Sequence, residues 1–519
     1  MPLTSPIHPP TGPEPDLDDI MCSLNATARM PKGMITETRE VIAMARKFKA
    51  KVMKPYTLAL DRHMQQDPEY LPWEFVQKAN AWGVYTMWIP KAFGGRGYNL
   101  PSLSCFLEET ASECLALANL VGVHYLAVAT VFSTWNIGLI TRLCRAVRQG
   151  EKKAAPCLMS TAVTEPDAGT DVEETALTDQ GNITCIARKV PGGYVVNGTK
   201  VFISNAHLSQ WHILIAYADA RKASEHIVIL AVQTGTEGFR FGRKERKMGV
   251  KGCPAGELIF NECFVPDALA LLTPDQCRQL QLLPGKAGAR ILDYTLAASR
   301  AGVGAFGTGA ARGAYECALD FAMKTEVDGK LLINHEWAQS MLAEMYKNAA
   351  AARLTYVEAN YANGLYGMFA LLQFKPIYYC LKWLPQVVAD KVVAPLMQLG
   401  TTTRLLRKRY LIRKNTNEFE RISGWGSLAK FAATDAGVKN CHMAVELMGQ
   451  AGLRQDMKIE KMFRDAKLLQ IYEGTNQLNR MNLFKCLLAR NMPAVKVFEH
   501  ENSGDASTSR LPKRRPHDR

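Results

Sequence analysis

The hydrophobic pattern of the chain changes twice, and this change constrains the fold more than any other feature. From about Pro156 to residue 280, short β-branched segments alternate apolar with polar residues and are separated by turn residues such as Asn197-Gly198. On both sides of this stretch, over residues 36–132 and from Asp293 onward, apolar residues recur at helical spacing. The order helices, sheet, helices predicts a mostly α-helical protein with a central antiparallel β domain.

These boundaries divide the chain into parts. We expect a flexible N-terminal tail (1–34), a helical domain (35–155), the β domain (156–280), a C-terminal helical bundle (281–494) with an inserted segment (361–421), and a disordered basic tail (495–519). The N-terminus has no basic start and no apolar core, so it predicts neither a secretory signal nor a mitochondrial presequence. The 13 cysteines have no metal-binding spacing, so we expect no metal, reduced thiols and a cytoplasmic protein.

One stretch, 114–141, carries no formal charge and is long enough to cross a membrane. Asn119, His124 and Asn136 interrupt it, and the surrounding chain has the composition of a soluble globular protein. We therefore expect a buried helix within a large helical core.

The net charge is +14, which suits a nucleic acid, an anionic membrane surface, or an anionic cofactor or substrate. No nucleic-acid-binding motif accompanies this charge, so we expect no nucleic-acid partner.

Two motifs carry candidate chemistry. The hydroxyls and amides of the first, TAVTEPDAGTD (161–171), can either hold a polar cofactor ring or cap a turn. The second, RDAKLLQIYEGTNQLNR (464–480), is a helical stretch that runs into Glu473-Gly474. Glycine permits a backbone break there, and a carboxylate placed in apolar surroundings by such a break has a raised pKa that suits a general base. The same residues are compatible with a surface glutamate followed by a C-capping glycine.

Both motifs resemble the signature sequences of the acyl-CoA dehydrogenase family, in the same order and separation. The segments IPKAFGGRG (89–97) and NGTKVFISNA (197–206) add to the resemblance, which covers about 36–490. It implies a helical domain, a β domain and a four-helix bundle, with FAD between the last two, in a homo-oligomer (dimer or tetramer). It also implies oxidation of an acyl-CoA to trans-2-enoyl-CoA in fatty acid β-oxidation, with an electron-transfer flavoprotein as electron acceptor.

The resemblance assigns roles residue by residue. Glu473 matches the catalytic base. Contacts with FAD are implied for Val163, Thr164, Thr170, Phe202, Ser204, Thr475 and Gln477. Contacts with the substrate are implied for Gly122, Thr170, Arg300 and Gly474. Gly122 belongs to VGVHY (121–125), which resembles the acyl-pocket floor of long-chain members and favours a medium-to-long acyl chain.

The sequence departs from the family pattern in its FAD contacts. Thr325 stands where the family has an arginine that binds the FAD pyrophosphate of a neighbouring subunit, and Asp328 stands where it has a phenylalanine. Glu446 occupies a segment that often contacts the adenine dinucleotide. A lost cation and a gained acid weaken diphosphate binding, unless Lys324 or Lys330 compensates.

The inserted segment 361–421 is the second departure. From 353 to 421 there are eleven Lys and Arg against four Asp and Glu, a surplus equal to half of the net charge. Aromatic and aliphatic residues with basic neighbours suit a peripheral contact with the inner face of a membrane, whereas an extra helical hairpin packed on the bundle is the alternative.

Three other functions are consistent with the sequence. An acyl-CoA oxidase or an enoyl-CoA reductase would use the same scaffold with a different electron acceptor or direction. An acyl-CoA-binding scaffold with impaired FAD binding is the non-enzymatic alternative, motivated by Thr325 and Glu446.

Overall fold

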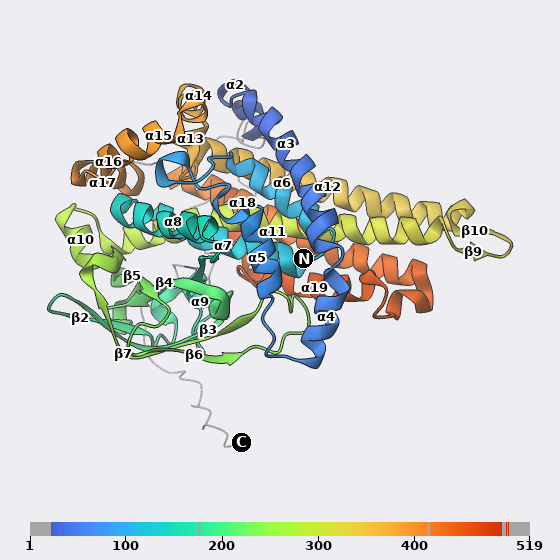
Figure 1. Cartoon of the computed structure of the whole chain (residues 1–519), viewed down its shortest axis with the longest axis horizontal. Helices are drawn as coiled ribbons and strands as arrows, with labels where there is room; N and C mark the ends of the chain where they lie inside the picture. The colour runs from blue at the N-terminus through green and yellow to red at the C-terminus, as the bar shows by residue number, and fades with distance from the viewer. Residues whose placement is uncertain (1–21, 175–176, 413–415, 490–494, 496, 498–519) are drawn as a thin grey trace, which may run out of the picture.

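The computed structural model describes residues 22–174, 177–412, 416–489, 495 and 497, and it places the β domain beside two helical regions (Figure 1). The N-terminal region holds helices α2 (Cys22–Arg29), α3 (Gly33–Phe48), α4 (Thr57–Gln66), α5 (Trp73–Ala81), α6 (Leu100–Ala111), α7 (Leu115–Ser133) and α8 (Ile137–Lys152). The fold class is therefore the predicted one: mostly helical, with a central sheet.

Part of the predicted N-terminal tail (1–34) is folded against the rest of the protein. Helix α2 lies inside it, and Cys22 and Ala26 are buried. The N–H of Ser23 donates to the carboxylate of Glu358 on α12 at 3.1 Å. Residues 1–21, and all of the predicted C-terminal tail except 495 and 497, lie outside the described residues.

Helix α7 is the central helix of the N-terminal region. It is the one described helix that is long and apolar enough to span a membrane, and 78% of that window is buried inside the protein. The ring nitrogen Nε2 of His124 lies 3.1 Å from the carbonyl oxygen of Tyr85, and the N–H of Met159 donates to Nδ1 at 3.2 Å. A core helix, as predicted, accounts for its uniform hydrophobicity.

The sheet is mixed rather than purely antiparallel. Its strands are β1 (Leu158–Ala162), β2 (Ile186–Val190), β3 (Gly193–Ser204), β4 (Ser209–Tyr217), β5 (Ile227–Gln233), β6 (Phe239–Lys244), β7 (Ala255–Pro266) and β8 (Ala270–Leu272). The order is β6-β7-β3-β2-β4-β5-β8, and β1 pairs in parallel with β4. Strand β2 also meets β4 in parallel, at Ile186 and Tyr217. Short helices α9 (Thr170–Glu173) and α10 (Pro274–Gln279) accompany the sheet.

The C-terminal bundle is built on α11 (Pro284–Ala322), α12 (Glu336–Tyr366) and α18 (Thr416–Met448), with α19 (Lys458–Leu469) and α20 (Asn476–Leu483) after them. Glycines on α11 permit close helix contacts. A Cβ on Gly307 would lie 2.5 Å from the backbone of Ala433 on α18, and one on Gly309 would lie 2.7 Å from the carbonyl oxygen of Glu108 on α6. Any larger side chain at these positions would push the helices apart.

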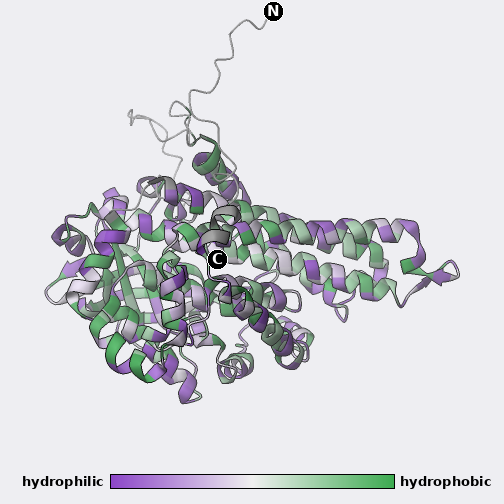
Figure 2. Cartoon of the chain, turned by 90° about the horizontal axis from the view of Figure 1, so that it is seen from above, coloured by the Kyte–Doolittle hydropathy of each residue, from purple (hydrophilic) through white to green (hydrophobic). Residues whose placement is uncertain are grey.

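Helices α11 and α12 extend beyond the rest of the molecule as a long pair, closed by the hairpin β9 (Glu326–Val327) and β10 (Lys330–Leu331) (Figure 2). Asp328 and Gly329 form its turn with φ of 48° and 77°. Between α12 and α18 the chain passes through α13 (Ala370–Gln373), α14 (Lys375–Trp383), α15 (Gln386–Val388), α16 (Ala394–Met397) and α17 (Gly400–Arg407), so the predicted insertion is helical.

Candidate active site

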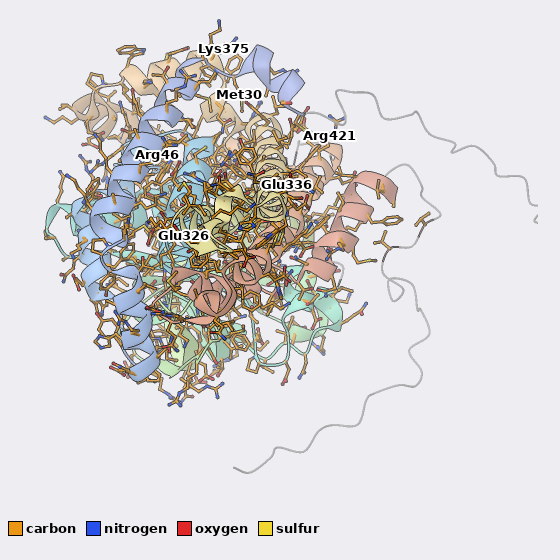
Figure 3. All side chains as sticks on the ribbon, turned by 90° about the vertical axis from the view of Figure 1, so that its right-hand side faces the viewer. Met30, Arg46, Glu326, Glu336, Lys375 and Arg421 are labelled. Carbon is orange, nitrogen blue, oxygen red and sulfur yellow. The ribbon has the colours of Figure 1, made fainter. Side chains whose placement is uncertain are left out.

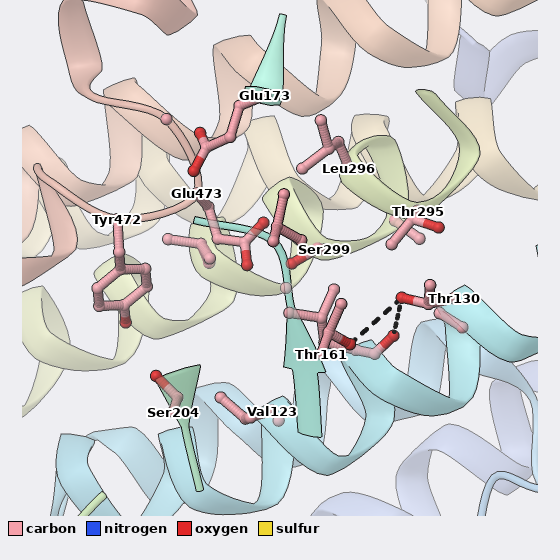
Figure 4. A pocket seen from close by; sticks show the side chains of 18 of the residues that line it. Val123, Thr130, Thr161, Glu173, Ser204, Thr295, Leu296, Ser299, Tyr472 and Glu473 are labelled. Atoms are coloured by element: carbon pink, nitrogen blue, oxygen red, sulfur yellow. Dashed lines mark hydrogen bonds between the residues drawn. The ribbon is translucent and has the colours of Figure 1, made fainter. Parts of the chain in front are cut away.

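A mostly apolar cleft of about 410 Å³ lies where α7, the β domain, α11 and the loop between α19 and α20 meet (Figure 4). The structure brings nine of the predicted site residues to its wall: Gly122, Val163, Thr164, Thr170, Phe202, Ser204, Glu473, Gly474 and Thr475. They come from all three parts of the chain, so folding, rather than proximity in the sequence, creates the site.

The loop after α19 places Glu473 in the cleft. Helix α19 ends at Leu469, and Glu473 and Gly474 both have left-handed backbone conformations, with φ of 56° and 77°. A left-handed glutamate is uncommon and is held here by its surroundings. Lys430, a buried lysine of α18, donates to the carbonyl oxygen of Gly474 at 2.7 Å and to Oδ1 of Asn476 at 2.7 Å.

The carboxyl group of Glu473 is removed from bulk water. Burial raises its pKa above that of an ordinary glutamate, while a hydrogen bond from Ser299 and the charges of Arg300 and Lys430 act in the opposite direction. Figure 4 shows Ser299, on α11, beside this carboxyl group. Oε2 of Glu473 has no hydrogen-bond partner among the described residues, so it is available to a group that enters the cleft.

Arg300 lies behind the loop rather than on the cleft wall. Its Nε donates to the carbonyl oxygen of Glu473 at 3.4 Å and its Nη1 to the hydroxyl of Ser427 at 3.2 Å. The guanidinium therefore supports the loop that carries Glu473. Because Arg300 does not line the cleft, its direct contact with the substrate stays a prediction.

Glu173 is a cleft residue that the sequence analysis missed. It ends α9, and a Cβ on Gly474 would lie 3.1 Å from its Oε2, which has no hydrogen-bond partner in the part of the chain that the structure describes. Burial, and then the neighbouring charge of Glu473, raise its pKa to about 7. The available signal was its position three residues after Thr170, which places both residues on one face of a single helical turn.

Lys430, which interacts with both of these acids, also has a shifted pKa. Burial, and then the charge of Arg300, lower its pKa to about 7, although Glu173 and Glu473 oppose this shift. Two acids with raised pKa values and a lysine with a lowered one therefore surround the same loop. Such clusters of perturbed groups in a cleft mark functional sites.

Phe202 adds an exposed aromatic ring to the cleft lining. It belongs to β3 at a shift in the register with β7, has φ of 59°, and is 61% exposed although it lines the cleft. A left-handed backbone is uncommon for phenylalanine and orients its ring toward the cleft, where a flat ligand would cover it. Thr164 and Ser204 also line the cleft and can offer hydroxyl groups to such a ligand.

One assignment needs correction, and another stays a prediction. Gln477, the second residue of α20, is exposed and lies outside the cleft lining, so its contact with FAD stays a prediction. Gly122 does line the cleft, but a Cβ there would lie 2.6 Å from Cζ of Phe306. The volume freed by Gly122 is therefore occupied by the Phe306 ring rather than left open to the acyl chain.

The departures from the family pattern lie away from the cleft lining. Thr325 adjoins the hairpin at the tip of the α11–α12 pair, and Lys324 is paired with Asp320 at 2.6 Å. Glu446 is exposed on α18. The aromatic face and hydroxyls of the cleft fit the ring of a flavin. Lys324, which could replace the arginine missing at Thr325, is instead engaged in its ion pair with Asp320.

Comparison with known proteins identifies the class. Models of the acyl-CoA dehydrogenase N-terminal, middle and C-terminal domains match residues 36–135, 160–263, and 286–372 with 381–488, respectively. The chain belongs to the acyl-CoA dehydrogenase family. Its members depend on FAD, so this chain is an FAD-dependent enzyme that acts on acyl-CoA thioesters.

Individual relatives are distant but cover nearly the whole chain. The acryloyl-CoA reductase (NADH) of Anaerotignum propionicum is 26% identical over 468 residues, 89% of this chain and 97% of the relative. The cyclohex-1-ene-1-carbonyl-CoA dehydrogenase of Syntrophus aciditrophicus is 28% identical over 408 residues, 78% and 80% of the two chains. The butyryl-CoA dehydrogenase structure from Megasphaera elsdenii has a TM-score of 0.66 at 22% identity, covers 87% of this chain and 98% of that one, and shows the same fold.

Proposed function

We propose that this enzyme oxidises an acyl-CoA to the trans-2-enoyl-CoA, with Glu473 as the base and an electron-transfer flavoprotein as electron acceptor. The observation that carries the proposal is the position of Glu473. A desolvated carboxyl group with a raised pKa and a free oxygen faces a cleft that also exposes an aromatic ring. Such a group is suited to remove a weakly acidic proton.

The residues around the loop prepare Glu473 for this task. Ser299 orients the carboxylate, and the charges of Arg300 and Lys430 favour its ionised form, which is the form that accepts a proton. The apolar cleft excludes water, which strengthens these interactions when substrate is bound. Bound FAD would supply the acceptor for the hydride that leaves the β carbon. Val163, Thr164, Thr170, Phe202, Ser204 and Thr475 would hold FAD.

The reductase direction is the second candidate. It is favoured by the likeness to a relative named acryloyl-CoA reductase. An oxidase, which passes electrons to oxygen, would use the same cleft. A scaffold without flavin is opposed by the exposed Phe202, which a flat ring would cover.

We also propose that the enzyme is a cytoplasmic homo-oligomer. Trp337, Tyr346 and Leu354 leave large apolar surfaces exposed along α12. A second copy packed on the extended α11–α12 pair would cover them. Light scattering of the purified holoenzyme measures this directly, and a monomer at micromolar concentration would contradict it.

Anaerobic flavin reduction tests the proposed reaction. Acyl-CoAs of increasing chain length are mixed with the holoenzyme, and bleaching of the flavin absorbance is followed by stopped flow. We expect fast bleaching by saturated acyl-CoAs and reoxidation by an electron-transfer flavoprotein rather than by oxygen. Bleaching by NADH with enoyl-CoA as the oxidant would establish the reductase, rapid reoxidation by oxygen the oxidase, and absence of bound flavin the scaffold.

A further inference from the structure

The segment from α14 to α17, residues 375–407, forms a surface that the proposed reaction does not explain. It lies outside the bundle, at the edge of the molecule, and Lys375 marks its position in side view (Figures 1 and 3). We refer to residues 374–409, which include the flanking Phe374, Lys408 and Arg409, as the connecting surface.

In the helical stretch 386–397 the small residues are buried and the large apolar residues are exposed. Ala389 and Ala394 are buried, and this stretch packs on the Gly-rich loop at Lys91–Phe93. The larger Val388, Val392 and Leu396 recur every four residues and are exposed. A surface helix of a soluble domain normally turns its large aliphatic residues toward its own core. This stretch presents them to something outside the chain.

The apolar area continues along the rest of the connecting surface. Nine of the 24 exposed large hydrophobic residues among the described residues lie between 374 and 405: Phe374, Tyr379, Trp383, Val387, Val388, Val392, Leu396, Leu399 and Leu405. Trp383 is 77% exposed, the most of all of them. Exposed apolar patches of this density mark interaction sites, and tryptophan is favoured where an apolar phase meets water.

The charges on the connecting surface indicate which partner it fits. Lys391, Arg404, Lys408 and Arg409 are exposed there. Asp390 is the one acidic residue from 374 to 409, and both of its oxygens accept from Nη1 of Arg148 at 2.9 Å. We propose that the connecting surface docks on an anionic lipid bilayer, with its apolar side chains inserted among the headgroups and its cations on lipid phosphates.

The other occupants fit less well. A twofold contact with a second copy would bring these cations against their own equivalents, which is unfavourable. A membrane-spanning role is excluded for these helices by length, because the longest continuous helical stretches, 386–397 and 400–412, have 12 and 13 residues and about 20 are needed. In-plane binding satisfies both the composition and the length.

The surface is held in place by the folded protein. Nζ of Lys91 donates to the carbonyl oxygen of Lys382 at 2.6 Å, and Gln386 donates to the carbonyl oxygen of Lys91 at 3.2 Å. Arg407 is buried and donates to the carbonyl oxygens of Thr134 and Leu271 at 2.9 Å and 2.6 Å. Because the surface is already ordered, binding does not require a folding step, and this lowers its entropic cost.

The connecting surface is also close to the cleft. Leu100 and Phe369 line both the cleft and a second cavity of about 60 Å³, whose wall includes Tyr378 and Leu381 of α14. Docking would therefore hold the cleft near the membrane surface, where long acyl chains partition. The proposal itself goes beyond the reaction and does not depend on the identity of the substrate.

Vesicle flotation of the full-length holoenzyme tests the proposal. Vesicles contain either phosphatidylcholine alone or phosphatidylcholine with about one third phosphatidylglycerol. We expect binding to the anionic vesicles that weakens with salt, because exposed charges are screened, and little binding to the neutral ones. The apolar variant Trp383→Ser with Leu396→Ser, and the charge variant Lys391→Gln with Arg404→Gln, should each bind at least about tenfold more weakly.

Matched controls separate this surface from the general positive charge of the protein. Leu453→Ser removes an exposed leucine elsewhere, and Lys222→Gln with Arg240→Gln removes two exposed cations from the β domain. Both controls should bind like the parent protein, and all variants should keep their flavin. Equal loss in controls and test variants, retained binding in the test variants, or a change of oligomeric state in the test variants alone would overturn the proposal.

Discussion

Glu173 and Glu473 reach the same end of the cleft from different domains, and each has an Oε2 without a hydrogen-bond partner among the residues that the structure describes. Glu173 arrives from the β domain and Glu473 from the bundle, as Figure 4 shows. Because each negative charge disfavours the other, the two carboxyl groups titrate as a coupled pair rather than independently. This relationship leads to three predictions about the pair.

Replacing Glu473 by Gln should abolish flavin reduction by acyl-CoA while leaving the flavin bound. The amide has the same shape but cannot accept the proton, and general bases contribute about 10²–10⁴-fold or more. Stopped-flow bleaching measures the rate, and the absorbance spectrum measures bound flavin. Near-normal bleaching would place the base elsewhere, with Glu173 the first candidate to test.

Replacing Glu173 by Gln should move the acid limb of the pH profile for flavin reduction to lower pH, by up to ~1 unit. The sign follows from the coupling of the pair: the charge of Glu473 raises the pKa of Glu173, and coupled carboxyl groups hinder each other's ionisation, so removing the second acid lets Glu473 ionise at lower pH. The rate at high pH should change little. An unchanged acid limb would mean that the two carboxyl groups do not interact in the working enzyme.

The same variant should change the pH dependence of stability. Burial raises the pKa of Glu173 to about 7 in the folded protein. The folded state therefore binds this proton more tightly than the unfolded chain does, and the contribution to stability is fully present below the ordinary glutamate pKa and lost as pH rises through about 7. Glu173→Gln should raise Tm relative to the parent at pH 8, by about 2 °C or more, and by little at pH 5.

The neighbouring acid provides the control for this experiment. Glu174 forms an ion pair with Lys485 at 2.7 Å. Glu174→Gln breaks this pair, so it should lower Tm at both pH values or leave it unchanged. A pH-dependent gain in both variants would show that the effect does not come from the coupling of Glu173 with Glu473.

The fold was more predictable from the sequence than the site. The spacing of apolar residues alone predicts the helical regions and the sheet, because each helix or strand must bury one face. The parallel contact of β1 with β4 was not predictable in this way, since it joins strands that are distant in the sequence. The ring of Phe306 at Gly122 and the support of the Glu473 loop by Arg300 depend on packing between elements, which no local pattern encodes.

Phe202 offers a test of flavin binding that does not depend on turnover. Phe202→Ala removes the exposed ring from the cleft wall, so FAD should bind at least about tenfold more weakly, whereas Phe202→Trp keeps an aromatic face and should retain it. Flavin fluorescence quenching during titration of the apoprotein with FAD measures both affinities. Phe264→Ala, at an exposed phenylalanine of β7, is the control and should bind FAD like the parent.

Lys430 tests whether the loop conformation, rather than the presence of a carboxylate alone, makes Glu473 effective. Its ammonium group holds the carbonyl oxygen of Gly474 and the side chain of Asn476, each at 2.7 Å. Lys430→Met keeps an unbranched apolar side chain but removes the ammonium group and both of its hydrogen bonds, so the loop should lose its fixed conformation. We expect flavin reduction to slow by about 10²-fold, since misplacement of a catalytic group by about 1 Å has effects of this size.

Lys439, on the same helix, is the matched control for Lys430. It is exposed and pairs with Glu344 at 2.7 Å. Lys439→Met should therefore leave the rate near that of the parent. In Lys430→Met the acid limb should also move to higher pH, because a nearby cation that favours ionised Glu473 has been removed. A slower rate with an unmoved acid limb would mean that Lys430 acts on position alone, and an unchanged rate would show that the loop does not need this lysine.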